Sequence, residues 1–298
     1  MTGCRFVSYF RTLFALFTFL CAAPVHAADT NDGFRVVTWN VEWLPGRKPD
    51  ATPEDGATHM AAVKKALKEF APDVLIAEEI RDHKVFDDFV SALPGLKTAV
   101  VSAFRDPATG SIAGQQIGIA SKLPCIASWS EKWQSAIDSV PRGFSFAAIE
   151  DPGSKKLILV YGVHLKSNRD RGDARIAELN TIWRDESARS LLRHIEDMEE
   201  TVFKGEIRGI IVGGDINTNH DGQFKDHVVE MMVRSGFHNC WEGVPPEDRQ
   251  TWRGGSVFLP TTFDYFFTKG LGKLRAELVP VADDTSDHHP VLITVPRT

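Results

Sequence analysis

The stretch Gly209-Ile210-Ile211-Val212-Gly213-Gly214-Asp215-Ile216-Asn217 is an apolar, β-like run that ends in two polar side chains. Three more β-like runs carry polar motifs at one end, namely Trp39-Asn40-Val41-Glu42, Glu78-Glu79 and Ser286-Asp287-His288-His289-Pro290. Carboxylates, carboxamides and an imidazole at strand ends are the groups that a hard divalent cation and a phosphate ester require. The combination predicts hydrolysis of a phosphoester bond.

Alternating or continuous apolar patterns predict strands along most of the chain. The expected strands are 34–41, 74–77, 116–120, 144–149, 157–163, 209–212, 263–268 and 290–295. Helical spacing of apolar residues predicts helices over 60–70 and 176–198. Because some neighbouring strands have no helix between them, the pattern favours two packed mixed sheets covered by helices over a strictly alternating parallel fold.

The amino-terminal segment has the pattern of a secretory signal peptide. Arg5 and Arg11 precede an apolar run over 13–23, and Val25-His26-Ala27 supplies small residues before a cut. The apolar run is shorter than the roughly 20 residues that span a bilayer, which disfavours a membrane anchor. We therefore expect residues 1–27 to be removed and the protein to be exported, either to a periplasm or out of the cell.

Residues 28–298 are predicted to form a single domain, because no Pro/Gly/Ser-rich linker, repeat or low-complexity stretch divides them. The formal charge of the whole chain is −6, and removal of the leader arginines makes the remainder more negative. Such a chain does not attract a polyanion as a whole, so binding of nucleic acid or anionic lipid requires bound metal and a local basic cluster. We expect a monomer with no stable protein partner.

Two cysteines remain after the predicted signal peptide, Cys125 and Cys240. An exported protein can form disulfides, but a bridge requires the two Cα atoms to lie within about 7 Å of each other. The sequence leaves one bridge and two buried thiols equally open. Neither cysteine has the surroundings of a catalytic nucleophile.

Asn40 and Glu42 are separated by one residue, so both side chains point to the same face of an extended strand. A carboxylate there can bind a metal ion and a carboxamide can hold a phosphate oxygen, although solvated polar residues at a strand end are the more common case. At the end of the next strand, Glu78 and Glu79 are expected to point in opposite directions, so only one of them can serve a site. Spacing alone does not decide which one.

His164 follows the predicted strand 157–163 and precedes a basic segment. The cations of this segment are the best candidate in the chain for a phosphate-binding patch, and they are Lys166, Arg169, Arg171 and Arg175. Asp170 and Asp173 offset part of their charge. The sequence therefore leaves a phosphate-binding patch and a solvated loop equally open.

Glycines before Asp215 allow the backbone to approach a ligand closely, and Asp215 and Asn217 share one side of an extended chain. A calcium-binding loop is a competing interpretation of the same segment. Asp215, Asn217, Asn219 and Asp226 match positions 1, 3, 5 and 12 of such a loop, with a shorter acid at the last position. His220 stands where that loop requires glycine, and the preceding segment is strand-like, so this alternative is disfavoured.

Asp264 lies in the largely apolar run Phe263-Asp264-Tyr265-Phe266-Phe267, and a buried acid nearly always has a partner. We expect this partner to be His288. An aspartate bonded to one ring nitrogen fixes the tautomer and raises the basicity of the other nitrogen, which suits acid–base chemistry near neutral pH. Asp287 could bind metal or orient a nucleophile, whereas His289 has no role that the sequence explains.

Taken together and in this order, the motifs resemble the endonuclease/exonuclease/phosphatase superfamily, whose members include pancreatic-type deoxyribonuclease, abasic-site endonucleases, inositol polyphosphate phosphatases and bacterial sphingomyelinases. The resemblance extends from about residue 34 to residue 296. It implies a four-layer α/β/β/α sandwich of two mixed β-sheets flanked by helices. It also implies dependence on Mg²⁺, or on Mn²⁺ or Ca²⁺ in its place.

The resemblance assigns roles motif by motif. The implied metal ligands are Glu42, Glu79 and Asp287, with Glu79 as the principal one. The implied catalytic residues are His164, Asp215, Asn217, Asp264 and His288, with Asp215 and Asn217 orienting the attacking water and holding the phosphate, and Asp264 and His288 forming an acid–base dyad. Asn40 and Arg142 are implied to contact phosphate, and together with Lys166, Asn168 and Arg169 of the basic segment they are the expected substrate-binding residues. The glutamine common before the principal glutamate is Glu78 here, which adds negative charge near the site.

The expected activity is hydrolysis of a phosphodiester by direct attack of water, and the basic segment after His164 favours an exported nuclease. The alternatives are a sphingomyelinase-like phospholipid phosphodiesterase and an inositol-phosphate phosphatase. An exposed apolar loop would favour a lipid substrate, and Val257-Phe258-Leu259-Pro260 is a weak candidate for one. A catalytically inactive binding module is disfavoured because every expected position carries a competent side chain.

Overall fold

The computed structural model describes residues 33–106, 109–135, 137, 140–256 and 258–297, which belong to the compact unit Asp32–Thr298. The predicted signal peptide, residues 1–27, and Val257 of the predicted apolar loop lie outside the described residues. In the part of the chain that is described, no helix is long and apolar enough to cross a membrane.

The strands of the described residues form two six-stranded sheets. The first has the order β11-β12-β1-β2-β4-β3, with β1 at Gly33–Leu44, β2 at Val74–Ile80, β3 at Lys97–Val101, β4 at Gln116–Ser121, β11 at Glu277–Leu278 and β12 at Val291–Pro296. The second has the order β5-β6-β7-β8-β10-β9, with β5 at Cys125–Lys132, β6 at Gly143–Glu150, β7 at Leu157–His164, β8 at Ile207–Asp215, β9 at His238–Asn239 and β10 at Asp264–Lys269. Both sheets are mixed, because β1 is parallel to β2 and β7 is parallel to β8 within otherwise antiparallel pairings.

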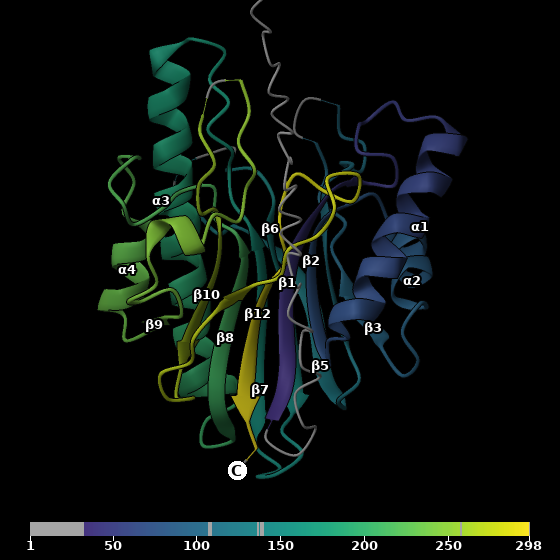
Figure 1. Ribbon diagram of the computed structural model, residues 1–298. Helices are drawn as coiled ribbons and strands as arrows, with labels where there is room; N and C mark the ends of the chain where they lie inside the picture. Colours follow the sequence, from purple (N-terminus) through teal and green to yellow (C-terminus); the bar gives the residue numbers. More distant parts are fainter. Residues whose placement is uncertain (1–32, 107–108, 136, 138–139, 257, 298) are drawn as a thin grey trace, which may run out of the picture. The chain divides into compact units, whose positions relative to one another are not determined.

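Helices cover the outer faces of both sheets (Figure 1). The helices α1 (Pro53–Phe70) and α2 (His83–Val90) lie against the first sheet, and α3 (Ala174–Asp197) and α4 (Val228–Arg234) lie against the second. A π-helical turn at Met198–Val202 continues α3, and a short 3₁₀ helix spans Pro246–Asp248. The predicted four-layer sandwich of two mixed sheets flanked by helices is confirmed.

The pleat of the strands explains why β1 and β2 are apolar on both faces. Val36 and Ile76 belong to the core between the two sheets, whereas their neighbours Val37 and Leu75 pack with α1 and α2. A Cβ added at Gly162 of β7 would come within 2.8 Å of the Ile76 side chain. The two sheets therefore pack face to face with Ile76 fitted over a position that has room only for glycine.

The structure contains elements that the apolar pattern missed. The helix expected from residue 60 begins at Pro53, because Thr52 and Asp55 form a capping box and proline occupies the first helical position. The missed elements are α2, α4, β3, β5, β9 and β11. Because β5 is an edge strand whose residues are mostly half-buried or exposed, it lacks the apolar run by which strands were predicted.

The two cysteines lie at opposite edges of the second sheet. Cys125 begins the edge strand β5 and is exposed, whereas Cys240 follows the other edge strand, β9, and is buried. Both thiols are free. The disulfide alternative is therefore wrong, and so is burial of Cys125, because the width of the sheet separates the two residues.

Strand register brings the polar motifs to one region. Asn40 of β1 lies opposite Glu78 of β2, and Asp215 of β8 lies between His164 of β7 and Asp264 of β10. Parallel neighbours end at the same edge of a sheet, and β1 also packs against β8 and β10 of the other sheet. The ends of five strands thus supply side chains to one place between the sheets.

Candidate active site

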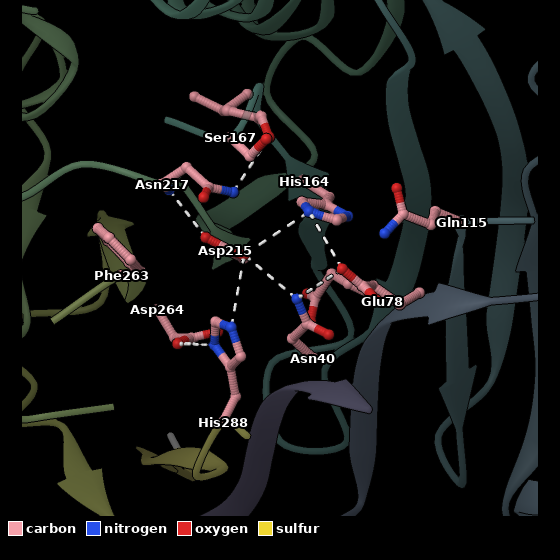
Figure 2. A network of polar contacts seen from close by, with 12 residues as sticks. Asn40, Glu78, Gln115, His164, Ser167, Asp215, Asn217, Phe263, Asp264 and His288 are labelled. Atoms are coloured by element: carbon pink, nitrogen blue, oxygen red, sulfur yellow. Dashed lines mark hydrogen bonds and ion pairs between the residues drawn. The ribbon is translucent and has the colours of Figure 1, made fainter. Parts of the chain in front are cut away.

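Asp215 lies at the centre of a buried cluster of polar side chains, with Asn40, His164 and His288 pointing toward it (Figure 2). Its Oδ2 accepts a hydrogen bond of 3.2 Å from Asn40 Nδ2 and lies 3.6 Å from His164 Nε2 and 3.9 Å from His288 Nε2. Burial raises the pKa of Asp215 to about 7, although the positive charge of His288 lowers it. A carboxylate with this pKa can exchange a proton near neutral pH.

Gly214 lets β8 deliver Asp215 to this position. Its φ of 143° favours glycine, and an added Cβ would come within 1.9 Å of the Val163 carbonyl oxygen. The close approach of β7 and β8 at this point brings His164 and Asp215 side by side as register partners. The glycine run in the sequence therefore serves strand packing beside the site.

His288 and Asp264 form the expected pair. Asp264 is 0% exposed, and its Oδ2 lies 2.7 Å from His288 Nδ1. Burial alone lowers the pKa of His288, but the charge of Asp264 and the hydrogen bond to it outweigh burial and hold this pKa well above the usual range of histidine. The backbone of His288 is also held, since its carbonyl accepts a hydrogen bond of 3.2 Å from Trp39 Nε1. The ring is thus fixed with Nε2 directed toward Asp215.

Glu79 faces the cluster, and Glu78 is buried behind it. A register shift between Glu78 and Ile80 and a φ of 62° at Glu79 turn the chain at the end of β2. Glu79 Oε1 lies 3.4 Å from Asn40 Nδ2 and 3.9 Å from His164 Nε2. Glu78 accepts a hydrogen bond of 2.8 Å from the Thr38 hydroxyl instead, and burial raises its pKa well above the usual value. The bulge therefore directs Glu79 to the cluster.

Glu42 and Asp287 lie next to each other at one side of the cluster. Glu42 Oε2 accepts hydrogen bonds of 2.7 Å from Arg47 Nε and 3.0 Å from the Asp287 amide, and Asp287 Oδ2 accepts one of 3.1 Å from Trp252 Nε1. The φ of Glu42 is 48°, so the chain is not extended there. The prediction that Asn40 and Glu42 share one strand face is therefore wrong, because strand alternation stops at Glu42.

His164 is a neutral imidazole in the floor of the cluster. Burial, with the positive charges of Arg142, His288 and Lys166, lowers the pKa of His164 well below its usual value. Arg142 donates hydrogen bonds of 3.2 Å and 2.9 Å to the carbonyls of His164 and Leu165, and one of 2.7 Å to Gln115 Oε1. Arg142 thus supports the backbone beside His164.

The structure separates the residues of the basic segment. Lys166 is half-buried, and its Nζ contacts the Ser167 hydroxyl and carbonyl at 3.2 Å. Asn168 donates a hydrogen bond of 2.6 Å to the Asn217 carbonyl, and Asn217 Nδ2 donates one of 3.2 Å to the Leu165 carbonyl. The remaining cations, Arg169, Arg171 and Arg175, are exposed, and Arg175 pairs with Asp173 at 3.0 Å. The patch therefore divides into one half-buried lysine and a solvated loop.

A model of the endonuclease/exonuclease/phosphatase family matches residues 37–288. The chain belongs to this family. The resemblance found in the motifs is therefore confirmed, and members of the family are hydrolytic phosphoesterases. No sequence among curated proteins matches the chain.

Solved structures share the fold at low sequence identity. The human Nocturnin catalytic domain with a bound sulfate anion has a TM-score of 0.66 and 15% identity over 91% of this chain and 96% of that one. A mannosyl-6-phosphatase from Bacteroides thetaiotaomicron VPI-5482 has a TM-score of 0.62 and 16% identity over 87% and 98%. A beta toxin from Staphylococcus aureus has a TM-score of 0.60 and 18% identity over 87% and 99%. At such identities the likeness shows the fold alone.

Family enzymes usually use divalent metals, and the donor atoms here fit a hard cation. Mg²⁺ is normally held by one or two carboxylates together with waters and substrate oxygens. Burial raises the pKa of Glu79. The positive charges of Arg142 and His288 lower this pKa, whereas the negative charge of Asp287 raises it. A bound cation would therefore relieve the repulsion between Glu79 and Asp287. Within the described ranges, no three His, Cys, Asp or Glu side chains form a closed group of ligands. Glu42 is the less suited acid, because Arg47 already binds it.

The calcium-binding loop considered for residues 215–226 is wrong. Asp226 forms a buried ion pair with Arg184, in which Nη2 and Oδ2 are 2.7 Å apart. Asn219 donates hydrogen bonds to Gln223 and Thr261. Both side chains are therefore engaged elsewhere, and the segment follows strand β8 where a calcium-binding loop would follow a helix.

Several residues of the site were missed in the sequence. Gln115 lies beside the cluster in Figure 2 and holds Arg142, and Trp252 binds Asp287. Ser286 donates a hydrogen bond of 2.7 Å to the Asn40 carbonyl and so ties the last motif to the first. Gln115 could have been found, because it is a polar residue directly before the predicted strand 116–120, as in the other motifs at strand ends. Trp252 gave no signal, because it lies far from every motif in the sequence.

Lys166 is expected to make substrate affinity depend on pH. Burial, together with the positive charges of Arg142, Arg184 and Arg169, lowers the pKa of Lys166 to about 8. The side chain is charged below this pH and neutral above it, so the KM for an anionic phosphoester should rise as the pH increases through about 8. Because arginine stays charged, Lys166→Arg should keep KM nearly constant from about pH 7 to about pH 9. An equal rise of KM in both proteins would show that Lys166 does not contact the substrate.

Proposed function

We propose that the protein is a divalent-metal-dependent phosphodiesterase that acts by direct attack of water, with nucleic acid as its substrate. The observation that carries this proposal is the convergence of Asp215, His288 and Glu79 from three motifs on one buried cluster. The cluster combines acid–base groups with carboxylates that fit a hard cation.

The proposed reaction forms one bond from the water oxygen to phosphorus and breaks the bond from phosphorus to the leaving oxygen, which takes a proton from solvent water to become an alcohol. Asp215, with a pKa of about 7, orients the water and accepts its proton. His288, kept protonated beside Asp264, stabilises the negative charge that develops on the phosphoryl group. When bound, a divalent cation supplies further neutralisation of that charge. No phosphorylated enzyme forms, because water is the nucleophile.

The remaining side chains position the substrate in this proposal. His164 is neutral, and its Nε2 can donate a hydrogen bond to a phosphate oxygen. Asn40 Nδ2 and the backbone amide of Asn217 both donate hydrogen bonds to the Asp215 carboxylate. Asn217 Nδ2 also donates to the Leu165 carbonyl, so both side-chain amides are fixed beside the reacting group. Lys166 adds a positive charge near His164, where it would attract a polyanion.

Nucleic acid is favoured by the exposed arginines that follow Lys166, which are Arg169 and Arg171. A phospholipid is the second candidate, because Leu259 is 81% exposed in the segment between Trp252, which binds Asp287, and Thr261. An inositol phosphate would use the same cluster.

Export remains part of the proposal, and amino-terminal sequencing of protein from a periplasmic fraction should find a start near Ala28.

A panel of substrates tests the proposal. Purified protein with Mg²⁺ or Mn²⁺ should cleave plasmid DNA or RNA faster than sphingomyelin or inositol phosphates, and EDTA should abolish the cleavage. Faster cleavage of sphingomyelin vesicles would transfer the assignment to the lipid class. If no phosphoester in the panel is cleaved with either metal, an inactive binding module becomes the better account.

A further inference from the structure

His59 connects two loops that lie far apart in the sequence and that both lead into the candidate active site. The side chain is 3% exposed on the buried face of α1. Its Nδ1 accepts a hydrogen bond of 2.9 Å from the Gly46 amide, and its Nε2 lies 2.7 Å from the Thr285 carbonyl oxygen. Both ring nitrogens of this histidine are therefore in use.

These two contacts determine the tautomer of the ring. A backbone amide can only donate and a carbonyl oxygen can only accept, so Nδ1 carries the lone pair and Nε2 carries the hydrogen. Burial lowers the pKa of His59, and the charge of Arg47 lowers it further. The hydrogen bond to Thr285 and the charge of Asp284 raise this pKa, but the net shift is downward. The ring is thus neutral and polarised, with its acceptor toward one loop and its donor toward the other.

The loop that ends at Thr285 continues directly into the last motif of the site. Ser286 Oγ accepts a hydrogen bond of 3.0 Å from the His288 amide and donates one of 2.7 Å to the Asn40 carbonyl. The Asp287 amide donates to Glu42, which lies just before the Gly46 loop. A displacement of Thr285 would therefore be transmitted to the backbone of both Asp287 and His288.

The chain at Gly46 is closely packed. Gly46 has a φ of 110°, and an added Cβ would come within 2.1 Å of Ala51 Cβ. Arg47, the next residue, holds Glu42 at 2.7 Å. His59 accordingly accepts a hydrogen bond from this closely packed chain through Nδ1 and presents Nε2 to the loop that carries the catalytic histidine.

We propose that His59 is a positioning residue for phosphoester hydrolysis, which sets the place of Asp287 and His288 through the hydrogen bond from Nε2 to the Thr285 carbonyl. The proposal rests on the proposed function of the cluster. His59 touches no reacting atom, so its effect should fall on the rate of the chemical step more than on substrate binding.

Two amide variants separate the two contacts of the ring. In His59→Gln the amide can reach the position of Nε2 and donate to Thr285, whereas in His59→Asn the shorter side chain can only accept from Gly46. We expect His59→Asn to lower kcat for bis(p-nitrophenyl) phosphate by about 10–10²-fold with KM nearly unchanged, which is the loss that a misplacement of about 1 Å typically causes. His59→Gln should recover most of this loss. The exposed His83 supplies matched controls, His83→Gln and His83→Asn, which should behave like the wild type.

Equal kcat values in His59→Gln and His59→Asn would overturn the proposal. A wild-type kcat in both, with only the melting temperature lowered, would also overturn it, because His59 would then be a packing residue. Both variants must therefore be compared as folded protein below their melting temperatures.

Hydrogen exchange keeps this inference separate from the proposed function. If the wild type cleaves no phosphodiester, the proposed function fails, and the exchange of the Asp287 and His288 amides decides the role of His59. These amides should exchange faster in His59→Asn than in His59→Gln, and equal rates would contradict the role. A ¹⁵N NMR spectrum of the wild type that shows hydrogen on Nδ1 of His59 would also contradict it.

Discussion

His288→Asn is expected to lower kcat for phosphodiester hydrolysis by about 10²–10³-fold, the range that one donor to the developing transition-state charge contributes. The asparagine amide takes the place of Nδ1, which lies 2.7 Å from Asp264 Oδ2, but it removes the Nε2 that lies 3.9 Å from Asp215. Initial rates at saturating substrate and Mg²⁺ measure the effect, with the exposed His83→Asn as the matched control.

Asparagine is a sharper test than alanine at this position. Asp264 is fully buried, and loss of its histidine partner would leave an unpaired carboxylate, which typically costs about 3–5 kcal/mol of stability. His288→Ala should therefore melt at a lower temperature than His288→Asn, and its loss of activity would mix chemistry with unfolding. Thermal unfolding of both variants distinguishes the two contributions.

Asp264→Asn extends the same test to the second member of the pair. Because the two residues act as a unit, the double variant Asp264→Asn/His288→Asn should lose little more activity than either single variant. Additive losses, or unchanged turnover in His288→Asn, would show that the pair does not participate in the chemical step.

Glu79→Gln is expected to raise the Mg²⁺ concentration for half-maximal activity by more than about 10–100-fold, since loss of an outer-shell partner alone typically costs that much metal affinity. Glutamine retains one oxygen to accept the hydrogen bond of 3.0 Å from the Trp43 amide, so the bulge at the end of β2 should persist. Titration of activity with Mg²⁺ measures the change, and Glu69→Gln on the exposed side of α1 is the matched control.

Calorimetric titration with Mg²⁺ in the absence of substrate gives an independent measurement. It should detect weaker binding in Glu79→Gln than in the wild type. Identical metal titrations for the two proteins would remove Glu79 from the metal site and would direct attention to Glu42 and Asp287.

The sequence was sufficient for the β-rich layers because burial and pleat act locally. Apolar runs such as those of β7 and β8 have buried residues at nearly every position, so both strands were found. The bounds of β7 were nearly correct, whereas β8 extends beyond the predicted 209–212 at both ends. The edge strand β5 was missed because it buries little. The hydrogen bond between Asp264 and His288 was also predictable, since a carboxylate inside an apolar run needs a partner.

Sequence spacing could not decide which of Glu78 and Glu79 faces the candidate active site. A register shift and a left-handed φ at Glu79 direct that side chain to the cluster, and neither feature leaves a signature in a pair of glutamates. Similarly, Lys166 and Arg169 both belong to the basic segment after His164, yet Lys166 is half-buried and Arg169 is exposed. Such differences depend on where neighbouring elements cover the chain.

By itself, the sequence determined the two-sheet sandwich, the family and the set of polar residues that end the strands, because hydrophobic periodicity and short motifs are local properties of the chain. Tertiary structure alone decided which of these residues meet and how they are held, as with Asn40 and Asp215, which are 175 positions apart. The contacts of His59 with Gly46 and Thr285 belong to the same class. Their physical cause is the packing of one sheet on the other, which fixes distances between segments that the order of residues leaves free.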